Sequence, residues 1–188
     1  MQTPTIPSEL TGTYRLDPAH SRVGFVARHA MITKVRGSFD RVEGTGYFDA
    51  SSPTSSHLEV RIDAGSVNTR NDDRDAHLRS PDFLDVDHYP EIRFVSTSVE
   101  QVEPDRYRVS GDLTIRDVTR PITIELAYTG TAVDPWGNQR IGFEGHGVLN
   151  RKDWGLTWNT VLEAGGVLVS EKVDLEVEVS AIRLPDES

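Results

Sequence analysis

Histidine is the side chain best suited to proton transfer or metal binding near neutral pH, and this chain has six of them. No two form a His-x-x-x-His pair or a His-Glu-x-x-His motif, so their spacing does not indicate a metal site. His29 ends an apolar stretch and has the same parity as Val23, Phe25 and Ala27. In a strand, side chains of one parity point to one side. We therefore expect no metal, and we expect His29 to supply a polar contact inside or at the mouth of an interior site.

The sequence offers little else for catalysis. It contains no Gly-x-Ser-x-Gly motif, which is typical of many serine hydrolases. Gly44-x-Gly46 lacks the third glycine and the following helix of a dinucleotide-binding loop. Cysteine is absent, which excludes disulfides, thiolate nucleophiles and cysteine-based metal sites. These patterns predict no catalytic residue and no cofactor.

An acidic run, Asn71-Asp72-Asp73-Arg74-Asp75, suggests calcium at first sight. It lacks the glycine at the sixth position and the distal glutamate of an EF-hand loop. The run instead resembles a helix N-terminus, because Asn and Asp cap helices well and Ala76 and Leu78 follow. We expect a short helix here, with Arg74, Asp75 and His77 in a polar network that holds the helix to the rest of the fold.

The elements that must position any site are strands. Apolar and polar residues alternate without a break over residues 173–181, which is typical of a strand with one dry face and one wet face. The same alternation recurs at Leu58, Val60 and Ile62; at Tyr107, Val109, Leu113 and Ile115; at Ile122, Ile124, Leu126 and Tyr128; and at Ile141, Phe143, Gly145, Gly147 and Leu149. Such strands bury their apolar sides together by closing into a barrel, which can also enclose a ligand.

Turn residues divide the chain into about eight strands, as in an antiparallel meander. Residues 1–13 are rich in Pro, Thr and Ser and are expected to form a flexible arm, followed by a single domain over residues 14–188. Residues 35–48 contain three glycines and predict one long bent strand or a broken pair. Residues 150–166 are irregular, and their Trp154 and Trp158 either plug one end of the barrel, line the mouth of a cavity, or do both.

The amino-acid composition and net charge narrow the classes of molecule that this chain is expected to bind. The 188 residues are 36% hydrophobic, and no stretch approaches the ~20 apolar residues that span a bilayer. A net charge of -10 disfavours nucleic acid and anionic membranes, which both attract clustered Lys and Arg. The first residues lack the basic region and the apolar run of a signal peptide, so a cytoplasmic location is expected.

Six motifs, taken in order, resemble the YceI-like family of polyisoprenoid-binding, lipocalin-like proteins. They are Asp17-x-x-His20-Ser21-x-Val23-x-Phe25; Gly37-Ser38-Phe39; Arg74-Asp75-x-His77-Leu78 with Asp82-Phe83-Leu84-Asp85; Tyr89-Pro90-x-Ile92-x-Phe94; Gly111-x-Leu113-Thr114-Ile115-Arg116 with Val118-Thr119-Arg120-Pro121; and Asn150-Arg151-x-Asp153-Trp154-Gly155. The resemblance extends from about residue 14 to residue 183. Asp117 departs from it, since relatives usually have glycine there, but Asp also suits a turn.

The resemblance implies an all-β fold, an extended eight-stranded antiparallel lipocalin-like barrel with one or two short helices. It also implies a long apolar tunnel for a polyisoprenoid or similar lipid, and a possible homodimer. Strand parity and motif position then suggest the residues that bind the lipid. They are Phe25, His29, Phe39, Phe83, Phe94, Trp154 and Trp158.

Three functions are consistent with these patterns. The first is a carrier or store that does no chemistry and binds an isoprenoid lipid such as a quinone or polyprenol. The second is an enzyme that acts on a lipid in the same cavity, with His29 as general acid or base. The third is an interaction module whose barrel is solid and whose surface is the site. A cavity separates the first two from the third, and turnover of the lipid separates the first from the second.

Overall fold

The computed structural model of the chain describes residues 6–30, 32–159 and 169–186. Runs rich in β-branched and aromatic residues favour strands, and strands dominate the fold. The strands are β1 (Gly12–Leu16), β2 (Arg22–His29), β3 (Thr33–Phe39), β4 (Val42–Phe48), β5 (His57–Asp63), β6 (Val67–Asn68), β7 (Glu91–Glu103), β8 (Arg106–Ile115), β9 (Val118–Val133), β10 (Gln139–Asn150) and β11 (Lys172–Arg183). The helical elements of this part of the chain are α1 (Asp72–Arg79) and the 3-10 turns η1 (Ser8–Leu10), η2 (Pro53–Ser55), η3 (Ala64–Ser66) and η4 (Arg151–Trp154).

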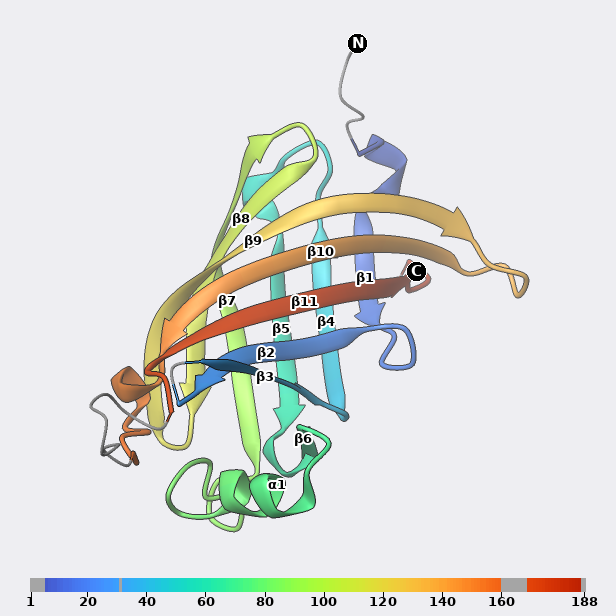
Figure 1. Cartoon of the computed structure of the whole chain (residues 1–188). Helices are drawn as coiled ribbons and strands as arrows, with labels where there is room; N and C mark the ends of the chain where they lie inside the picture. The colour runs from blue at the N-terminus through green and yellow to red at the C-terminus, as the bar shows by residue number, and fades with distance from the viewer. Residues whose placement is uncertain (1–5, 31, 160–168, 187–188) are drawn as a thin grey trace.

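Eight of these strands close into an antiparallel barrel. The hydrogen-bonded order is β1–β4–β5–β7–β8–β9–β10–β11, and β11 pairs back with β1, where Ala181 lies opposite Leu16. In Figure 1 the long strands β9, β10 and β11 sweep across the steeper strands β1, β4, β5 and β7. The predicted eight-stranded antiparallel barrel with a short helix is therefore confirmed.

The remaining strands extend the sheet from one edge of β11. β2 pairs with β11 over residues 174–178, whereas β1 pairs with β11 over residues 181–183, so β1 and β2 lie one after the other along that edge. β3 adds to β2, and the short β6 adds to the end of β3, next to α1 (Figure 1). Residues 35–48 are thus the broken pair of the two alternatives, because β3 ends at Phe39 and β4 begins at Val42 in another part of the sheet.

Helix α1 begins where the sequence predicts. The Asn71 side chain accepts a hydrogen bond from Arg74 N at 3.0 Å, which is the expected N-cap. Asp75 and Arg74 both bind Thr69, which follows β6, through hydrogen bonds of 2.5–2.9 Å. His77 lies outside this group and hydrogen-bonds with Asp82. No helix in the described residues is long and apolar enough to cross a membrane.

The segment expected to be a flexible arm is partly built into the fold. Residues 1–5 lie outside the described part of the chain. From residue 6 onward the segment is packed, because Ile6 and Leu10 are only 3% and 4% exposed. Tyr14 fixes the segment further by donating a hydrogen bond from its hydroxyl to Leu10 O at 2.7 Å. The arm prediction is therefore wrong for residues 6–13. The many Pro, Thr and Ser residues suggested a flexible segment, but two apolar residues among them, Ile6 and Leu10, are buried in the fold.

The inward residues of the barrel strands differ in how deeply they are buried. On β8 the inward residues Tyr107, Val109, Leu113 and Ile115 are buried. On β7 a bulge between Ser96 and Ser98 shifts the apolar phase, so that Val99 is buried along with Phe94. Several inward residues of β9 and β11 are only half-buried, namely Ile122, Leu126, Val173, Leu175 and Val179. Half-buried apolar residues on the inner face mean that side chains do not fill the barrel.

Candidate functional site

A cavity of about 380 Å³ occupies the barrel interior. Residues of all eight barrel strands contribute to its wall, together with residues of β2, β3 and β6. The wall is almost wholly apolar, with Leu16, Val60, Phe94, Leu126 and Val177 as representative members. Small-molecule sites typically have volumes of about 300–1,000 Å³ and apolar walls with a few polar groups. The cavity fits that description.

Glycines on neighbouring strands leave space for two of the aromatic rings that line the cavity. The Phe25 ring of β2 covers Gly37 of β3, and a Cβ atom at residue 37 would lie 2.8 Å from Phe25 Cε2. The Phe94 ring of β7 covers Gly111 of β8 in the same way, and a Cβ atom at residue 111 would lie 2.7 Å from Phe94 Cε2. Each ring therefore lies along the wall, in space that a neighbouring side chain would otherwise take.

Aromatic clusters are found at two places on the cavity. One joins Phe48, Tyr107 and Phe143, with ring centroids 5.7–6.3 Å apart. The other joins Phe83 to Trp158 and His77, with ring centroids 5.5 Å and 5.1 Å apart respectively. In both clusters the rings meet at tilted or edge-on angles, which is the favoured geometry for aromatic pairs. Phe48, Tyr107, Phe143 and Phe83 line the cavity, whereas His77 and Trp158 pack against Phe83 outside the wall.

Arg151 is a buried charged residue on this wall, with 4% of its surface exposed. Its guanidinium donates hydrogen bonds to main-chain carbonyl oxygens of Leu156, Trp158, Val169 and Ser170, at 2.6–3.2 Å. Its Cζ lies 5.8 Å from the centroid of the Phe83 ring. Burial lowers the pKa of the guanidinium from its ordinary value. Sequence reasoning gave Arg151 no role, because its partners are backbone atoms that no side-chain pattern reveals.

The predicted lining residues fall into two groups. Phe25, Phe39, Phe83 and Phe94 all line the cavity, as strand parity and motif position predict. Trp154 does not line it: this residue is 2% exposed and donates from Nε1 to Leu113 O at 2.8 Å, which anchors η4 against the barrel. Two wall residues near the N-terminus, Tyr14 and Leu16, were not predicted from the sequence. They lie on β1, and the sequence pattern indicated no strand before about residue 20.

Trp158 and His29 are placed differently from the sequence expectation. Trp158 is half-buried and packs behind Phe83, outside the cavity wall formed by the described residues. His29 is exposed and is not among the wall residues, so the structure does not place it inside the barrel, and a contact at the mouth stays a prediction. Parity holds as far as Ala27, which lines the cavity, and His29 at the end of β2 pairs with Thr33 of β3 and bridges to Val169, which is itself a wall residue.

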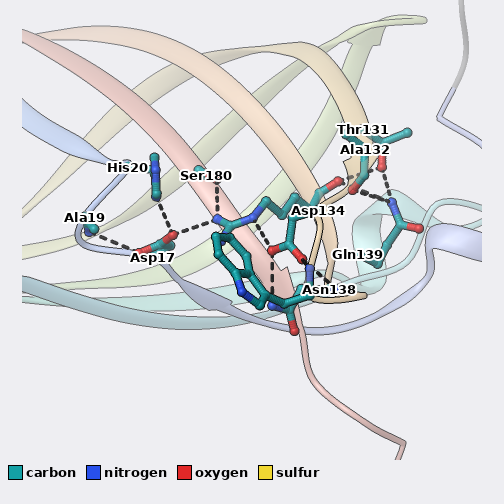
Figure 2. Close-up of polar contacts among 11 residues, drawn as sticks. Asp17, Ala19, His20, Thr131, Ala132, Asp134, Asn138, Gln139 and Ser180 are labelled. Atoms are coloured by element: carbon teal, nitrogen blue, oxygen red, sulfur yellow. Dashed lines mark hydrogen bonds and ion pairs between the residues drawn. The ribbon is translucent and has the colours of Figure 1, made fainter.

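A polar cluster outside the cavity joins the β9–β10 hairpin to the turn between β1 and β2 (Figure 2). Arg140 donates from Nη1 to Asp17 Oδ2 at 2.6 Å and from Nε to Asp134 Oδ2 at 2.9 Å. His20 Nδ1 lies 2.7 Å from the same oxygen of Asp17. No hydroxyl in the described residues is hydrogen-bonded to the His20 ring, so this acid–imidazole pair has no nucleophile attached. The cluster acts as a clamp between two turns.

The two carboxyl groups of this clamp are strongly acidic. The pKa of Asp17 is lowered to about 2, chiefly by the hydrogen bond from Arg140 and then by the His20 ring. For Asp134 desolvation acts to raise the pKa, but hydrogen bonds from Asn138 and Arg140 outweigh it and lower the pKa to about 2. Across residues 6–30, 32–159 and 169–186, His, Asp and Glu side chains form no group of three or more that could hold a metal ion.

Comparisons with known proteins agree with this fold. The profile of the YceI-like domain matches residues 14–181. Protein YceI of Shigella flexneri is 36% identical over 178 residues, which cover 94% of this chain and 90% of that protein. The crystal structure of Burkholderia cenocepacia BcnA is similar with a TM-score of 0.77 at 19% identity, covering 88% of this chain and 98% of BcnA. A polyisoprenoid binding domain from Saccharophagus degradans has a TM-score of 0.67 at 17% identity, covering 91% of this chain and 98% of that domain.

Proposed function

The chain belongs to the YceI-like family, and from this premise we propose that it binds a long apolar lipid chain inside its barrel and serves as a carrier or store for that lipid. The observation that carries the proposal is the cavity of about 380 Å³, whose wall is almost wholly apolar. Transfer of an apolar chain from water to an apolar wall of this extent is favourable. The half-buried inner rows of β9 and β11 supply the surface that such a chain would cover.

Burial alone provides enough free energy for tight binding. Each five-carbon isoprene unit contributes roughly 3–4 kcal/mol at about 0.8 kcal/mol per buried carbon, before the cost of ordering the chain. A few units therefore reach useful affinity without a polar contact. Selectivity then depends on the length and width of the cavity, which the rings of Phe25, Phe39, Phe83 and Phe94 help to set.

We propose a polyisoprenoid or an isoprenoid quinone as the chain. The Saccharophagus degradans domain, described as polyisoprenoid binding, has the same fold, and its ligand supports this class. The branched and ridged shape of an isoprenoid also suits a wall that is lined by β-branched and aromatic side chains, such as Val60, Ile122 and Phe143.

A carrier is favoured over an enzyme by the surroundings of the acid–base groups. His29, the residue that an enzyme would have used, is exposed and is not a wall residue. His57 and Glu59 do contribute to the wall, but His57 is exposed and Glu59 is ion-paired with Arg61 and Arg93. The Asp17–His20 pair also belongs to the clamp outside the cavity. An interaction module with a solid barrel is disfavoured by the cavity itself.

Titration of the lipid-free protein tests the proposal. Isoprenoid alcohols of increasing length, from farnesol to long polyprenols, would be titrated against protein stripped of lipid by organic extraction and refolding. We expect saturable 1:1 binding whose affinity rises about tenfold or more with each added isoprene unit, until the cavity is full. Recovery of the lipid with an unchanged mass after long incubation would support the carrier. The absence of saturable binding by any of these chains would overturn the proposal.

A further inference from the structure

Arg151 is a cation buried in an apolar wall, and its hydrogen-bond partners in the described part of the chain are all backbone atoms. Nε donates to Ser170 O at 2.8 Å, Nη1 donates to Leu156 O at 2.6 Å and to Trp158 O at 2.9 Å, and Nη2 donates to Val169 O at 3.2 Å. A guanidinium has five N–H groups, and these bonds use four of them. One N–H on Nη2 is therefore left without a partner among the described residues.

The charge of Arg151 is not neutralised by an ion pair with any described residue. Glu171 is close enough to affect it electrostatically, but its carboxylate is paired with Lys152 Nζ at 2.7 Å and is 43% exposed. Carbonyl dipoles stabilise a buried cation, yet they do not cancel its charge, and an unpaired buried charge is costly. Among the described residues, the carbonyl oxygens of Leu156, Trp158, Val169 and Ser170 are the groups that stabilise this charge.

The position of Arg151 on the cavity wall places this charge where a bound ligand could contact it. Arg151 lines the cavity next to Phe83, whose ring also lines it. The site thus combines an apolar interior with a cation in its wall, beside the aromatic cluster of Phe83, Trp158 and His77. A ligand that matches both features has an apolar chain and an anionic head.

We propose that Arg151 binds the head group of the lipid and selects an anionic oxygen head, a carboxylate or a phosphate, over an uncharged hydroxyl. The inference rests on the proposed function and adds the chemistry of the head group to it. A guanidinium suits both anions, because it keeps its positive charge and is more weakly hydrated than an ammonium, and the remaining N–H of Nη2 is a donor for one anionic oxygen.

Matched pairs of ligands test the proposal at neutral pH. Hexadecanoic acid would be compared with hexadecanol, and farnesyl phosphate with farnesol, each pair differing only in the head. We expect the native protein to bind the anionic member at least about tenfold more tightly in one or both pairs. A preference in the first pair alone identifies a carboxylate, and a preference in the second alone identifies a phosphate. Equal affinities in both pairs would overturn the inference, while failure of all four ligands to bind would overturn the proposed function.

Variants then assign the preference to Arg151. Arg151→Met keeps the length of the side chain and removes its charge, so it should reduce the preference for the anionic member of each pair to within about twofold, whatever its effect on the affinity that both members share. Arg151→Lys keeps the charge and should retain most of the preference. Lys172→Met is the control, because Lys172 is 69% exposed and its contact with Asp174 is 3.9 Å long. A preference that survives in folded Arg151→Met would contradict the assignment.

A measurement on the native protein covers the case in which Arg151→Met does not fold. Hexadecanoic acid with a ¹³C-labelled carboxyl would be bound, and the carboxyl resonance followed by NMR as a function of pH. An apolar site by itself raises the pKa of a carboxyl group, whereas a neighbouring cation lowers it. We expect the bound carboxyl to titrate below the free acid, and titration above the free acid would overturn the inference.

Discussion

Phe25 covers Gly37 on the neighbouring strand, so closely that a Cβ atom at residue 37 would lie 2.8 Å from Phe25 Cε2. The two residues face each other directly in the β2–β3 ladder. The centroid of the Phe25 ring lies 5.7 Å from the centroid of the Phe39 ring. Phe25 is thus held along the wall, and the width of the cavity at this point depends on a glycine one strand away.

The first prediction follows from this contact. Gly37→Ala should displace the Phe25 ring into the lumen and weaken the binding of a long polyprenol by about tenfold or more. The double variant Gly37→Ala with Phe25→Ala should recover most of the affinity, because the ring that was displaced is gone. Titration of the lipid-free variants measures both effects. Equal affinity in Gly37→Ala and the native protein would show that the ring does not limit the cavity.

The second prediction concerns a charge in the cavity. Phe25→Asp places a carboxylate on an apolar wall, where an unpaired charge is costly, and should reduce lipid uptake at least about tenfold. The barrel should remain folded, since Phe25 is only half-buried. Val148→Asp is the matched control: Val148 is 51% exposed on β10 and lies outside the wall, so this added carboxylate should leave binding unchanged. Unchanged binding in folded Phe25→Asp would remove Phe25 from the site.

The third prediction separates stability from binding. Trp154→Phe removes the hydrogen bond from Nε1 to Leu113 O and leaves a buried carbonyl unpaired, which typically costs about 1–3 kcal/mol. The free energy of unfolding in urea should fall by this amount, while lipid affinity stays the same, because Trp154 is not a wall residue. Trp136→Phe is the control, since Trp136 is 80% exposed and its replacement should change stability by less than about 0.5 kcal/mol. A large loss of affinity in folded Trp154→Phe would place this residue in the binding site after all.

The fourth prediction is a pH dependence. The pKa values of Asp17 and Asp134 are about 2 in the folded protein, against about 3.9 for an unperturbed aspartate. Between these values the unfolded chain binds more protons, so the clamp contributes stability above about pH 4 and loses it as the pH falls towards about 2. Urea midpoints measured across this window should decline with acid.

Arg140→Gln tests the origin of this decline. Without the guanidinium, the pKa values of the two carboxyls move back towards the ordinary value, and the loss of stability between about pH 4 and 2 becomes smaller. Arg36→Gln breaks an exposed ion pair with Glu176 and should leave the slope unchanged. A native-like slope in Arg140→Gln would mean that other groups cause the acid sensitivity.

Local alternation was enough to predict the barrel but not all of its pairing. β8 and β11 alternate over their whole length, so their strands and inward faces follow from the sequence. β1 was missed, because Gly12–Leu16 is short and follows a stretch rich in Pro, Thr and Ser. The pairing of β2 with β11 joins residues about 150 positions apart, and no local pattern encodes that contact.

In the candidate site, too, the positions set by local alternation followed from the sequence, and those set by distant contacts did not. Phe25 and Phe94 lie on the cavity wall, as parity indicates, because each lies within a strand where parity determines the face. His29 shares the parity of Phe25 but is exposed and not a wall residue, because parity does not say where along a strand the wall ends. Arg151 received no role because its environment is made by carbonyls of two loops, and a buried charge is visible only once those loops are placed.

Mass spectrometry of the protein purified without detergent tests the central claim most directly. The native mass would be measured first, followed by the masses of the protein and the extract after treatment with organic solvent. We predict an excess mass at near 1:1 stoichiometry that is released into the extract as a lipid with a long apolar chain, and that is absent from Phe25→Asp. A protein that carries no extractable lipid and, once stripped, takes up no polyprenol, quinone or fatty acyl chain would contradict the account.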